Sequence, residues 1–189
     1  MTKSEIIFKR IFDLFLSLFG LFFLGWFIFL CAFISFYLTK KNGFFKQKRV
    51  GQFGTLFYIY KIRTINLNSS EYFNKYSRFL RKSKIDELPQ LLNVLLGEMS
   101  FVGPRPDIIG FADQLKGDEK KILLLKPGIT GPASIFFKNE EQLLNSQNNK
   151  IKYNREIIWP KKVSLNMKYI EEYSFKNDLL FLFKTILNL

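Results

Sequence analysis

The sequence predicts a mainly α-helical fold with one small β-hairpin, an α+β domain preceded by an N-terminal membrane helix. Three observations lead to this prediction. An uncharged apolar run occupies residues 14–38, two short aromatic-rich runs flank residues 52–54, and leucines recur at helical spacing further along. A chain of 189 residues is long enough for one domain with its own core, but too short for two full domains beside a membrane segment. We therefore divide it into a membrane-associated part, residues 1–41, and one soluble domain, residues 42–189.

The composition combines a strongly basic charge with a high apolar content. The formal net charge is +13, phenylalanine occurs 23 times and hydrophobic residues make up 48% of the chain. The excess of cations fits nucleic acid, anionic lipid or phosphorylated substrates equally well. There is no histidine, so acid and base chemistry falls to carboxylates or lysines. The single cysteine, Cys31, lies inside the apolar run, and we interpret it as a small hydrophobic residue.

The apolar run from Leu14 to Leu38 is the predicted membrane segment. It is longer than the roughly 20 residues that cross about 30 Å of hydrocarbon, and it lacks the small-residue cleavage site of a signal peptide. Lysine and arginine flank it on both sides, so the positive-inside rule leaves two topologies open. One is a single-pass anchor, and the other is a re-entrant helix that bends within the membrane. In either topology, Asp13 could form an ion pair with Lys9 or Arg10 at the membrane edge.

The next predicted element is a β-hairpin over residues 43–65, with its turn at Gln52-Phe53-Gly54. Lys61 and Arg63 are two residues apart in the second strand, so one strand face should carry both cations. That face is either solvated or available to bind phosphate. Residues 66–75 are polar and predict a loop.

Two helices are predicted after this loop. Residues 76–82 predict a short basic helix whose buried side holds Phe79 and Leu80. Residues 83–97, SKIDELPQLLNVLLG, predict a helix packed on a core by its leucines, with Pro89 in the first turn and a glycine at the end.

Asp86 and Glu87 open the second of these helices, and two roles are available to them. Acidic residues at a helix N-terminus cap free N–H groups and favour the positive end of the dipole, which is a structural role. The same position lowers the pKa of a carboxylate and keeps it ionised as a nucleophile or a Mg²⁺ ligand. The local sequence permits both roles at once.

Two loops rich in proline and glycine follow. In GEMSFVGPRP, residues 97–106, Arg105 lies between two prolines that restrict the backbone, which suits bidentate phosphate recognition. In KPGITGPAS, residues 126–134, Lys126 opens a segment that we interpret as a shaped lid or pocket wall. The terminal run, residues 179–189, is too short to span a membrane and predicts either an interfacial amphipathic helix or a core helix.

These motifs resemble the monotopic phosphoglycosyl transferase family, the small bacterial sugar transferases that start glycan assembly on undecaprenyl phosphate. The resemblance covers nearly the whole chain and is most specific over residues 85–106. It extends to FKRIFD, QKRVG, YKIRT, KPGITG and the closing YIEEYSFKNDLLFLFKTI, which occupy residues 8–13, 47–51, 60–64, 126–131 and 169–186. The resemblance implies a bacterial inner-membrane enzyme with its catalytic domain on the cytosolic face. It also favours the re-entrant helix, with interfacial amphipathic helices beside it.

The resemblance further implies a two-step reaction. Asp86 matches the nucleophile of the family's Asp-Glu pair and would attack the β-phosphate of a UDP-sugar, releasing UMP. Polyprenyl phosphate would then accept the phosphosugar from this covalent intermediate. Asp86 would also help bind Mg²⁺, and Glu87 would assist as a base or an outer metal ligand. The cations assigned to phosphates are Lys61, Arg63, Arg81, Arg105 and Lys126.

Three departures from the family pattern restrict what carries over. Gly25 and Trp26 occupy the positions where members commonly bend the membrane helix at Ser-Pro. Lys126 stands where many members have arginine, and residues 132–134 are Pro-Ala-Ser instead of Trp-Ala-Gln. The transferred group therefore stays open between a hexose 1-phosphate and an N-acetylated amino sugar phosphate. The length of the chain leans toward the small forms of the family, several of which use modified N-acetyl sugars.

A non-enzymatic alternative is a basic, membrane-tethered adaptor that binds anionic lipid or nucleic acid. It accounts for the charge of +13, but it does not explain a carboxylate pair followed by an arginine between prolines. For the transferase, the expected partners are a UDP-sugar, polyprenyl phosphate and the bacterial inner membrane, without nucleic acid. The oligomeric state stays open.

Overall fold

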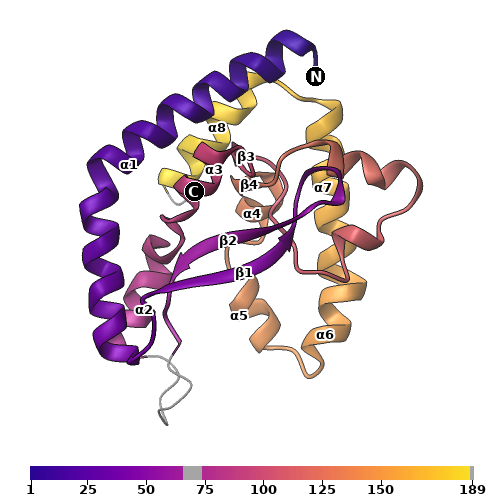
Figure 1. Ribbon diagram of the computed structural model, residues 1–189. Helices are drawn as coiled ribbons and strands as arrows, with labels where there is room; N and C mark the ends of the chain where they lie inside the picture. The colour runs from indigo at the N-terminus through magenta and orange to yellow at the C-terminus, as the bar shows by residue number, and fades with distance from the viewer. Residues whose placement is uncertain (66–73, 188–189) are drawn as a thin grey trace. The chain divides into compact units, whose positions relative to one another are not determined.

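The computed structural model describes residues 1–65 and 74–187 (Figure 1), so most of the loop predicted at 66–75 and the last two residues lie outside it. The fold is mainly helical with a small antiparallel hairpin, which confirms the predicted fold class. The chain divides into two compact units. The hairpin unit comprises residues 11–48 and 57–99, and the C-terminal unit comprises residues 1–10, 49–56 and 100–189.

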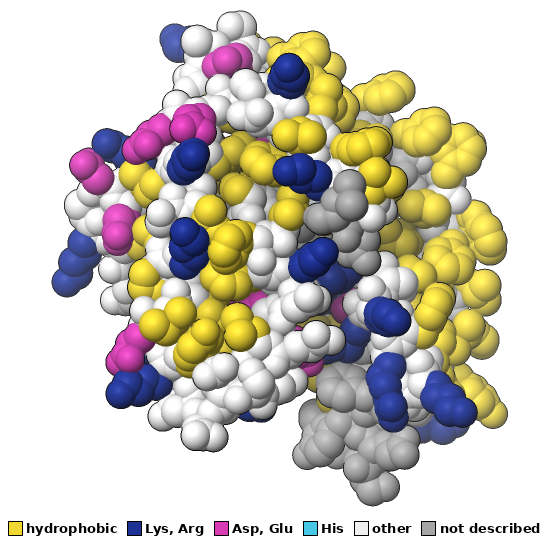
Figure 2. All heavy atoms as spheres, turned by 180° about the vertical axis from the view of Figure 1, so that it is seen from behind, with side chains coloured by type: hydrophobic (Ala, Val, Ile, Leu, Met, Phe, Trp, Pro, Cys, Tyr) yellow, Lys and Arg dark blue, Asp and Glu magenta, His cyan; other side chains and the backbone are white. Residues whose placement is uncertain are grey.

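Helix α1, Lys3–Thr39, contains the whole apolar run. Within the described residues, it is the one helix long and apolar enough to cross a membrane. Its buried positions are mostly small or polar, whereas large apolar side chains point outward: Phe22 is 81% exposed and Trp26 is 69% exposed. Figure 2 shows such hydrophobic side chains gathered along α1, and Figure 1 shows α1 as one continuous helix with a bend. An apolar surface of this extent is typical of contact with a membrane or a protein partner.

Strands β1, Phe44–Val50, and β2, Leu56–Ile62, form the predicted hairpin around the short 3₁₀ turn η1, Gln52–Gly54. The chain passes very close to α1 just before β1. A Cβ atom at Gly43 would lie 1.9 Å from the carbonyl oxygen of Ala32, so only glycine fits there without a backbone shift.

Helix α2, Lys75–Lys82, follows the segment that is not described. Leu80 is fully buried and packs in a small core with Cys31 and Ile62, as predicted for its apolar side. The prediction that Phe79 is also buried is wrong, because Phe79 is 59% exposed. Ser77, three residues before Leu80, shares the inner face instead.

The helix predicted over residues 83–97 is divided into two parts. A 3₁₀ turn, η2, covers Ile85–Glu87, and helix α3 covers Gln90–Leu96. Pro89 stands at the start of α3, and Gly97 ends it with φ 85°, as predicted. Helix α3 packs on α1, since a Cβ atom at Gly20 would lie 3.1 Å from Leu91.

The C-terminal unit contains a strand pair that the sequence did not predict. Strand β3, Ser100–Val102, pairs in parallel with β4, Gly128–Thr130. Its core includes Ile122 and Val163. The α-helices of this unit are α4 Pro132–Phe136, α5 Glu140–Asn145, α6 Lys150–Tyr153, α7 Trp159–Glu171 and α8 Phe175–Ile186; η3 Ala112–Gln114 and η4 Gly117–Leu124 are 3₁₀ helices, and η5 Asn154–Ile158 is a π-helix.

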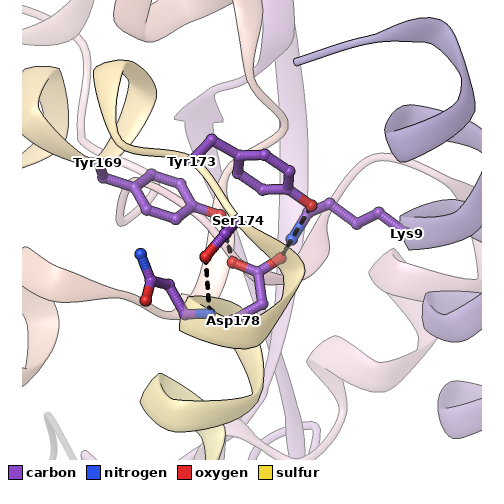
Figure 3. Close-up of polar contacts among 6 residues, drawn as sticks. Lys9, Tyr169, Tyr173, Ser174 and Asp178 are labelled. Carbon is purple, nitrogen blue, oxygen red and sulfur yellow. Dashed lines mark hydrogen bonds and ion pairs between the residues drawn. The ribbon is translucent and has the colours of Figure 1, made fainter.

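A buried polar cluster holds the first residues of α1 within the C-terminal unit (Figure 3). Asp178 of α8 is 1% exposed, forms an ion pair with Lys9, and accepts a 2.6 Å hydrogen bond from the hydroxyl of Tyr169. Phe8 packs edge-on against Phe175, with 4.7 Å between the ring centroids. Lys9 therefore has a partner from the far end of the chain, which the sequence did not indicate.

Candidate active site

The Asp-Glu pair lies in the hairpin unit, in turn η2 between α2 and α3. Lys84, the residue before the turn, adopts φ 59°, a left-handed conformation that residues other than glycine rarely take. Such backbone conformations persist only where the surroundings enforce them, and they cluster at functional sites. The turn buries Asp86, which is 8% exposed.

The pKa of Asp86 is raised to about 6, first by burial and then by the neighbouring Glu87. Lys61, Arg81 and Lys84 act in the opposite direction. The expectation that a helix N-terminus lowers this pKa is therefore wrong. Lost hydration and a like charge outweigh the three cations, and the carboxylate lies in a short 3₁₀ turn instead of the first turn of a long helix.

Lys61 reaches the Asp-Glu pair from strand β2. It lies on the same strand face as the buried Phe57 and Ile59, so its side chain points inward. Its Nζ is 2.7 Å from Oε1 of Glu87, and both side chains are mostly buried. Within the part of the chain that the structure describes, the carboxylate of Asp86 has no hydrogen-bond partner. Glu87 is thus held by a lysine, while Asp86 stays available.

The structure brings together only some of the predicted cations. Lys61 and Arg81 lower the pKa of Asp86, and so does Lys84, which the sequence analysis did not single out. Its position two residues before Asp86 was the available signal. Arg63 instead follows the end of β2, where its Nε donates a 2.7 Å hydrogen bond to the carbonyl of Asn42. Its guanidinium also lies over the ring of Phe45.

Arg105 and Lys126 belong to the C-terminal unit, in two loops that lie backbone to backbone. Gly103 N donates to the carbonyl of Thr130 at 2.9 Å, and Gly128 N donates to the carbonyl of Pro104 at 2.7 Å. A Cβ atom on either glycine would meet backbone atoms within 2.4 Å, which explains both glycines. The two loops rich in proline and glycine therefore pack against each other through their backbones.

Beside these loops lies a charged cluster that the sequence reasoning missed. Burial raises the pKa of Asp107 to about 6, although Lys162, Arg105 and Arg49 lower it. Lys162 itself is buried and forms a 2.8 Å ion pair with Glu140. The C-terminal unit thus also contains a carboxylate that is harder to ionise, because burial outweighs the cations around it.

The donor atoms near η2 fit a magnesium ion. Within the described residues, no group of three or more Asp, Glu, Cys or His side chains forms a ready cage for a metal. Mg²⁺ does not need one, because it keeps several waters and binds through one or two carboxylates together with substrate phosphates. The Asp86 carboxylate, which lacks a hydrogen-bond partner and has its pKa raised, is a donor that a hard cation would satisfy.

Comparison with known proteins defines the class. The family model described as bacterial sugar transferase matches residues 4–189. The chain is 38% identical over 152 residues to the uncharacterized sugar transferase EpsL of Bacillus subtilis, covering 76% of this chain and 67% of that protein.

Two further relatives are longer proteins. The chain is 29% identical over 201 residues to the UDP-glucose:undecaprenyl-phosphate glucose-1-phosphate transferase of Klebsiella pneumoniae, covering 98% of this chain and 41% of that one. It is 31% identical over 156 residues to the UDP-N-acetylgalactosamine-undecaprenyl-phosphate N-acetylgalactosaminephosphotransferase of Aeromonas hydrophila, covering 75% and 34%.

The chain thus combines a long apolar helix with a carboxylate pair set among cations. The chain belongs to the bacterial sugar transferase family, an enzyme family, as its motifs predicted. It spans well under half the length of the Klebsiella and Aeromonas relatives.

Proposed function

We propose that this protein transfers a sugar 1-phosphate from a UDP-sugar to polyprenyl phosphate at a membrane, with release of UMP. The observation that carries the proposal is the buried Asp86 carboxylate, with Glu87 and three cations around it, in the same unit as an apolar helix. The printed names of the Klebsiella and Aeromonas relatives, each naming a UDP-sugar and undecaprenyl phosphate, support the same reaction class.

In the first step, an oxygen of Asp86 attacks the β-phosphorus of the UDP-sugar. The bond from that phosphorus to the bridging oxygen breaks, UMP leaves, and the sugar phosphate is held on Asp86 as an acyl phosphate. In the second step, a phosphate oxygen of the polyprenyl acceptor attacks the same phosphorus and returns Asp86 to its carboxylate form. A pKa of about 6 supports this role, because Asp86 is then mostly ionised at neutral pH yet more basic than an ordinary aspartate.

The cations beside the pair offset the charge of the diphosphate. Lys61 orients Glu87, while Arg81 and Lys84 add positive charge near the attacked phosphorus. Bound Mg²⁺, held by Asp86 and the substrate phosphates, would neutralise further charge. The assignment of Arg105 and Lys126, in the C-terminal unit, to phosphates stays a prediction.

We also propose that α1 is re-entrant. Lys9 precedes the apolar run and pairs with Asp178, which follows it by a long stretch of chain. Among the described residues after Thr39, no further helix is long and apolar enough to cross a membrane. A spanning α1 would separate Lys9 from Asp178 by about 30 Å of hydrocarbon, so the ion pair favours both ends of α1 on one side. We assign that side to the cytosolic face of the bacterial inner membrane.

The test of the reaction is UMP release from purified protein in nanodiscs with undecaprenyl phosphate, Mg²⁺ and a panel of UDP-sugars. The panel includes glucose, galactose and their N-acetylated amines. Asp86→Asn should abolish release, whereas Asp118→Asn, at an exposed carboxylate, should leave it unchanged. No release from folded wild-type protein with any donor would reject the transferase and favour the adaptor.

Topology has a separate test. A cysteine introduced at the exposed Thr2 is treated in intact cells with a maleimide that does not cross the inner membrane. A re-entrant α1 predicts labelling only after the cells are opened. Labelling in intact cells would show a single-pass anchor.

A further inference from the structure

We propose that Asn93 is a positioning residue, whose side-chain amide locks strand β2 onto helix α3 and thereby sets Lys61 and Glu87 beside Asp86. The inference rests on the proposed function and adds a residue outside the reacting groups. It concerns only the hairpin unit, which contains all of these residues.

Every polar atom of the Asn93 side chain is engaged by its neighbours. Asn93 is 0% exposed. Its Nδ2 donates to the carbonyl of Tyr58 at 2.7 Å and to Oε2 of Glu98 at 2.7 Å. Its Oδ1 accepts from the N–H of Tyr60 at 3.1 Å. The amide thus pairs with one C=O and one N–H of β2, as a neighbouring strand would.

The Asn93 side chain is connected to the Asp-Glu pair in two ways, through strand β2 and through helix α3. Lys61 directly follows Tyr60 in β2, and its Nζ lies 2.7 Å from Glu87. Turn η2, with Glu87, leads through Pro89 into α3, which carries Asn93. The strand and the helix are therefore fixed to each other at two points, the buried amide and the ion pair. If the amide contact is lost, the ion pair alone must hold the register of β2 against α3.

A purely apolar residue could fill the space of Asn93, so its polarity calls for a reason. Backbone groups of β2 would then be buried without partners, which lowers the stability of the fold. If Asn93 had only a structural role, its replacement would lower stability and would not lower turnover further. A positioning role predicts a loss of turnover beyond the loss of stability, because small displacements of charged groups at a reacting centre can reduce the rate by about 100-fold.

The experiment compares Asn93→Leu with a matched control, Tyr76→Phe. The control removes a part-buried hydrogen bond of the hairpin unit, from the Tyr76 hydroxyl to the carbonyl of Cys31 at 2.7 Å. We expect Asn93→Leu to lower kcat for UMP release by roughly 100-fold while KM for the UDP-sugar changes little. Tyr76→Phe should lower the melting temperature but keep kcat within about twofold of wild type.

A double-mutant cycle with Lys61→Met tests the connection itself. If Asn93 acts through Lys61 and Glu87, removing Lys61 should lower kcat in the wild type but have little further effect in Asn93→Leu. Amide hydrogen exchange supplies a readout that needs no activity: the β2 segment containing Tyr60 should lose protection in Asn93→Leu and keep it in Tyr76→Phe.

If Asn93→Leu does not fold, Asn93→Ala replaces it. It removes the amide and its bonds to Tyr58, Tyr60 and Glu98 without adding bulk or charge at this buried position. A fall in kcat of similar size is expected. Wild-type turnover together with unchanged kcat in a folded Asn93 variant, or with additive losses in the cycle, overturns the inference alone. No wild-type turnover with any donor overturns the proposed function itself.

Discussion

The ion pair between Lys9 and Asp178 gives the sharpest prediction about stability. Asp178→Asn keeps the size of the side chain and an oxygen that can accept from Tyr169, 2.6 Å away. It removes only the negative charge, so Lys9 keeps its positive charge, at 13% side-chain exposure, without a counter-ion. Breaking a buried ion pair from one side typically costs about 3–5 kcal/mol.

We take the lower end of this range, about 3 kcal/mol, because the partly exposed Lys9 can recover some hydration. For a chain of this size, each kcal/mol corresponds to roughly 2–4 °C in melting temperature. Asp178→Asn should therefore melt about 6–12 °C below the wild type. Adding Lys9→Met removes the stranded charge, so the double variant should recover part of the loss.

The assay is thermal unfolding in nanodiscs, followed by circular dichroism. The control is Glu172→Gln, which breaks the pair with Lys168 at 3.8 Å, where both side chains are about two-thirds exposed. Exposed pairs contribute about 0–1 kcal/mol, so this variant should melt near the wild type. The reasoning would be refuted if Asp178→Asn melted with the control, or if the double variant lost the sum of the two single losses.

Three further predictions follow from other contacts. In the folded protein the pKa of Asp107 is raised from an ordinary 3.8 to about 6, so the fold favours the protonated carboxyl. The free energy of unfolding should therefore be highest below pH 4 and fall by up to about 3 kcal/mol as the pH rises through 6. Melting temperature measured from pH 4 to 8 should show this fall in the wild type and not in Asp107→Asn; the same pH dependence in both proteins would contradict the prediction. Gly43→Ala should lose about 1–3 kcal/mol or more in the same melting assay, because its Cβ would lie 1.9 Å from a backbone oxygen, whereas Gly25→Ala, with open space around it, should lose nothing. Lys61→Met should slow UMP release roughly 100-fold, while Lys121→Met, at an exposed pair, should match wild type; equal rates would remove Lys61 from the site.

Sequence signals correctly predicted the elements that depend on a few neighbouring residues, such as turns and helix ends. The turn at residues 52–54 predicted the hairpin, and Gly97 predicted the end of α3. The strand pair β3–β4 was missed because each strand has three residues, too few for a period of two to be recognised.

Helical periodicity predicts which residues share the apolar face of a helix, but it does not predict whether that face packs on the protein core. Leu92 and Leu96 fit the pattern of a core helix, yet both are exposed on α3. Phe79 on α2 behaves in the same way. Beside a membrane, an apolar side chain can be exposed in the protein and still be removed from water, so periodicity cannot separate the two cases.

The sequence named candidate residues, but it did not indicate their electrostatics. The motif around residues 85–106 singled out Asp86 and Glu87, whereas the pKa of Asp86 depends on its burial, on Glu87 and on Lys61, which comes from a separate strand. The partner of Lys9 lies 169 residues away, beyond the reach of any local pattern.

The raised pKa of Asp86 has a consequence for how such a site must be built. A carboxylate with an ordinary pKa is always ionised at neutral pH but is a weak nucleophile, whereas a fully desolvated one becomes more basic and is then protonated. Burial together with Glu87 moves Asp86 toward the second case, and Lys61, Arg81 and Lys84 limit the shift to about 6. In the proposed reaction these cations would have two effects at once. They would offset the phosphate charge of a donor, and they would keep Asp86 ionised. The position of Lys61 against the Asp-Glu pair then matters as much as its presence. The buried side-chain amide of Asn93 bonds to the backbone of Tyr58 and Tyr60 in β2, and Tyr60 directly precedes Lys61.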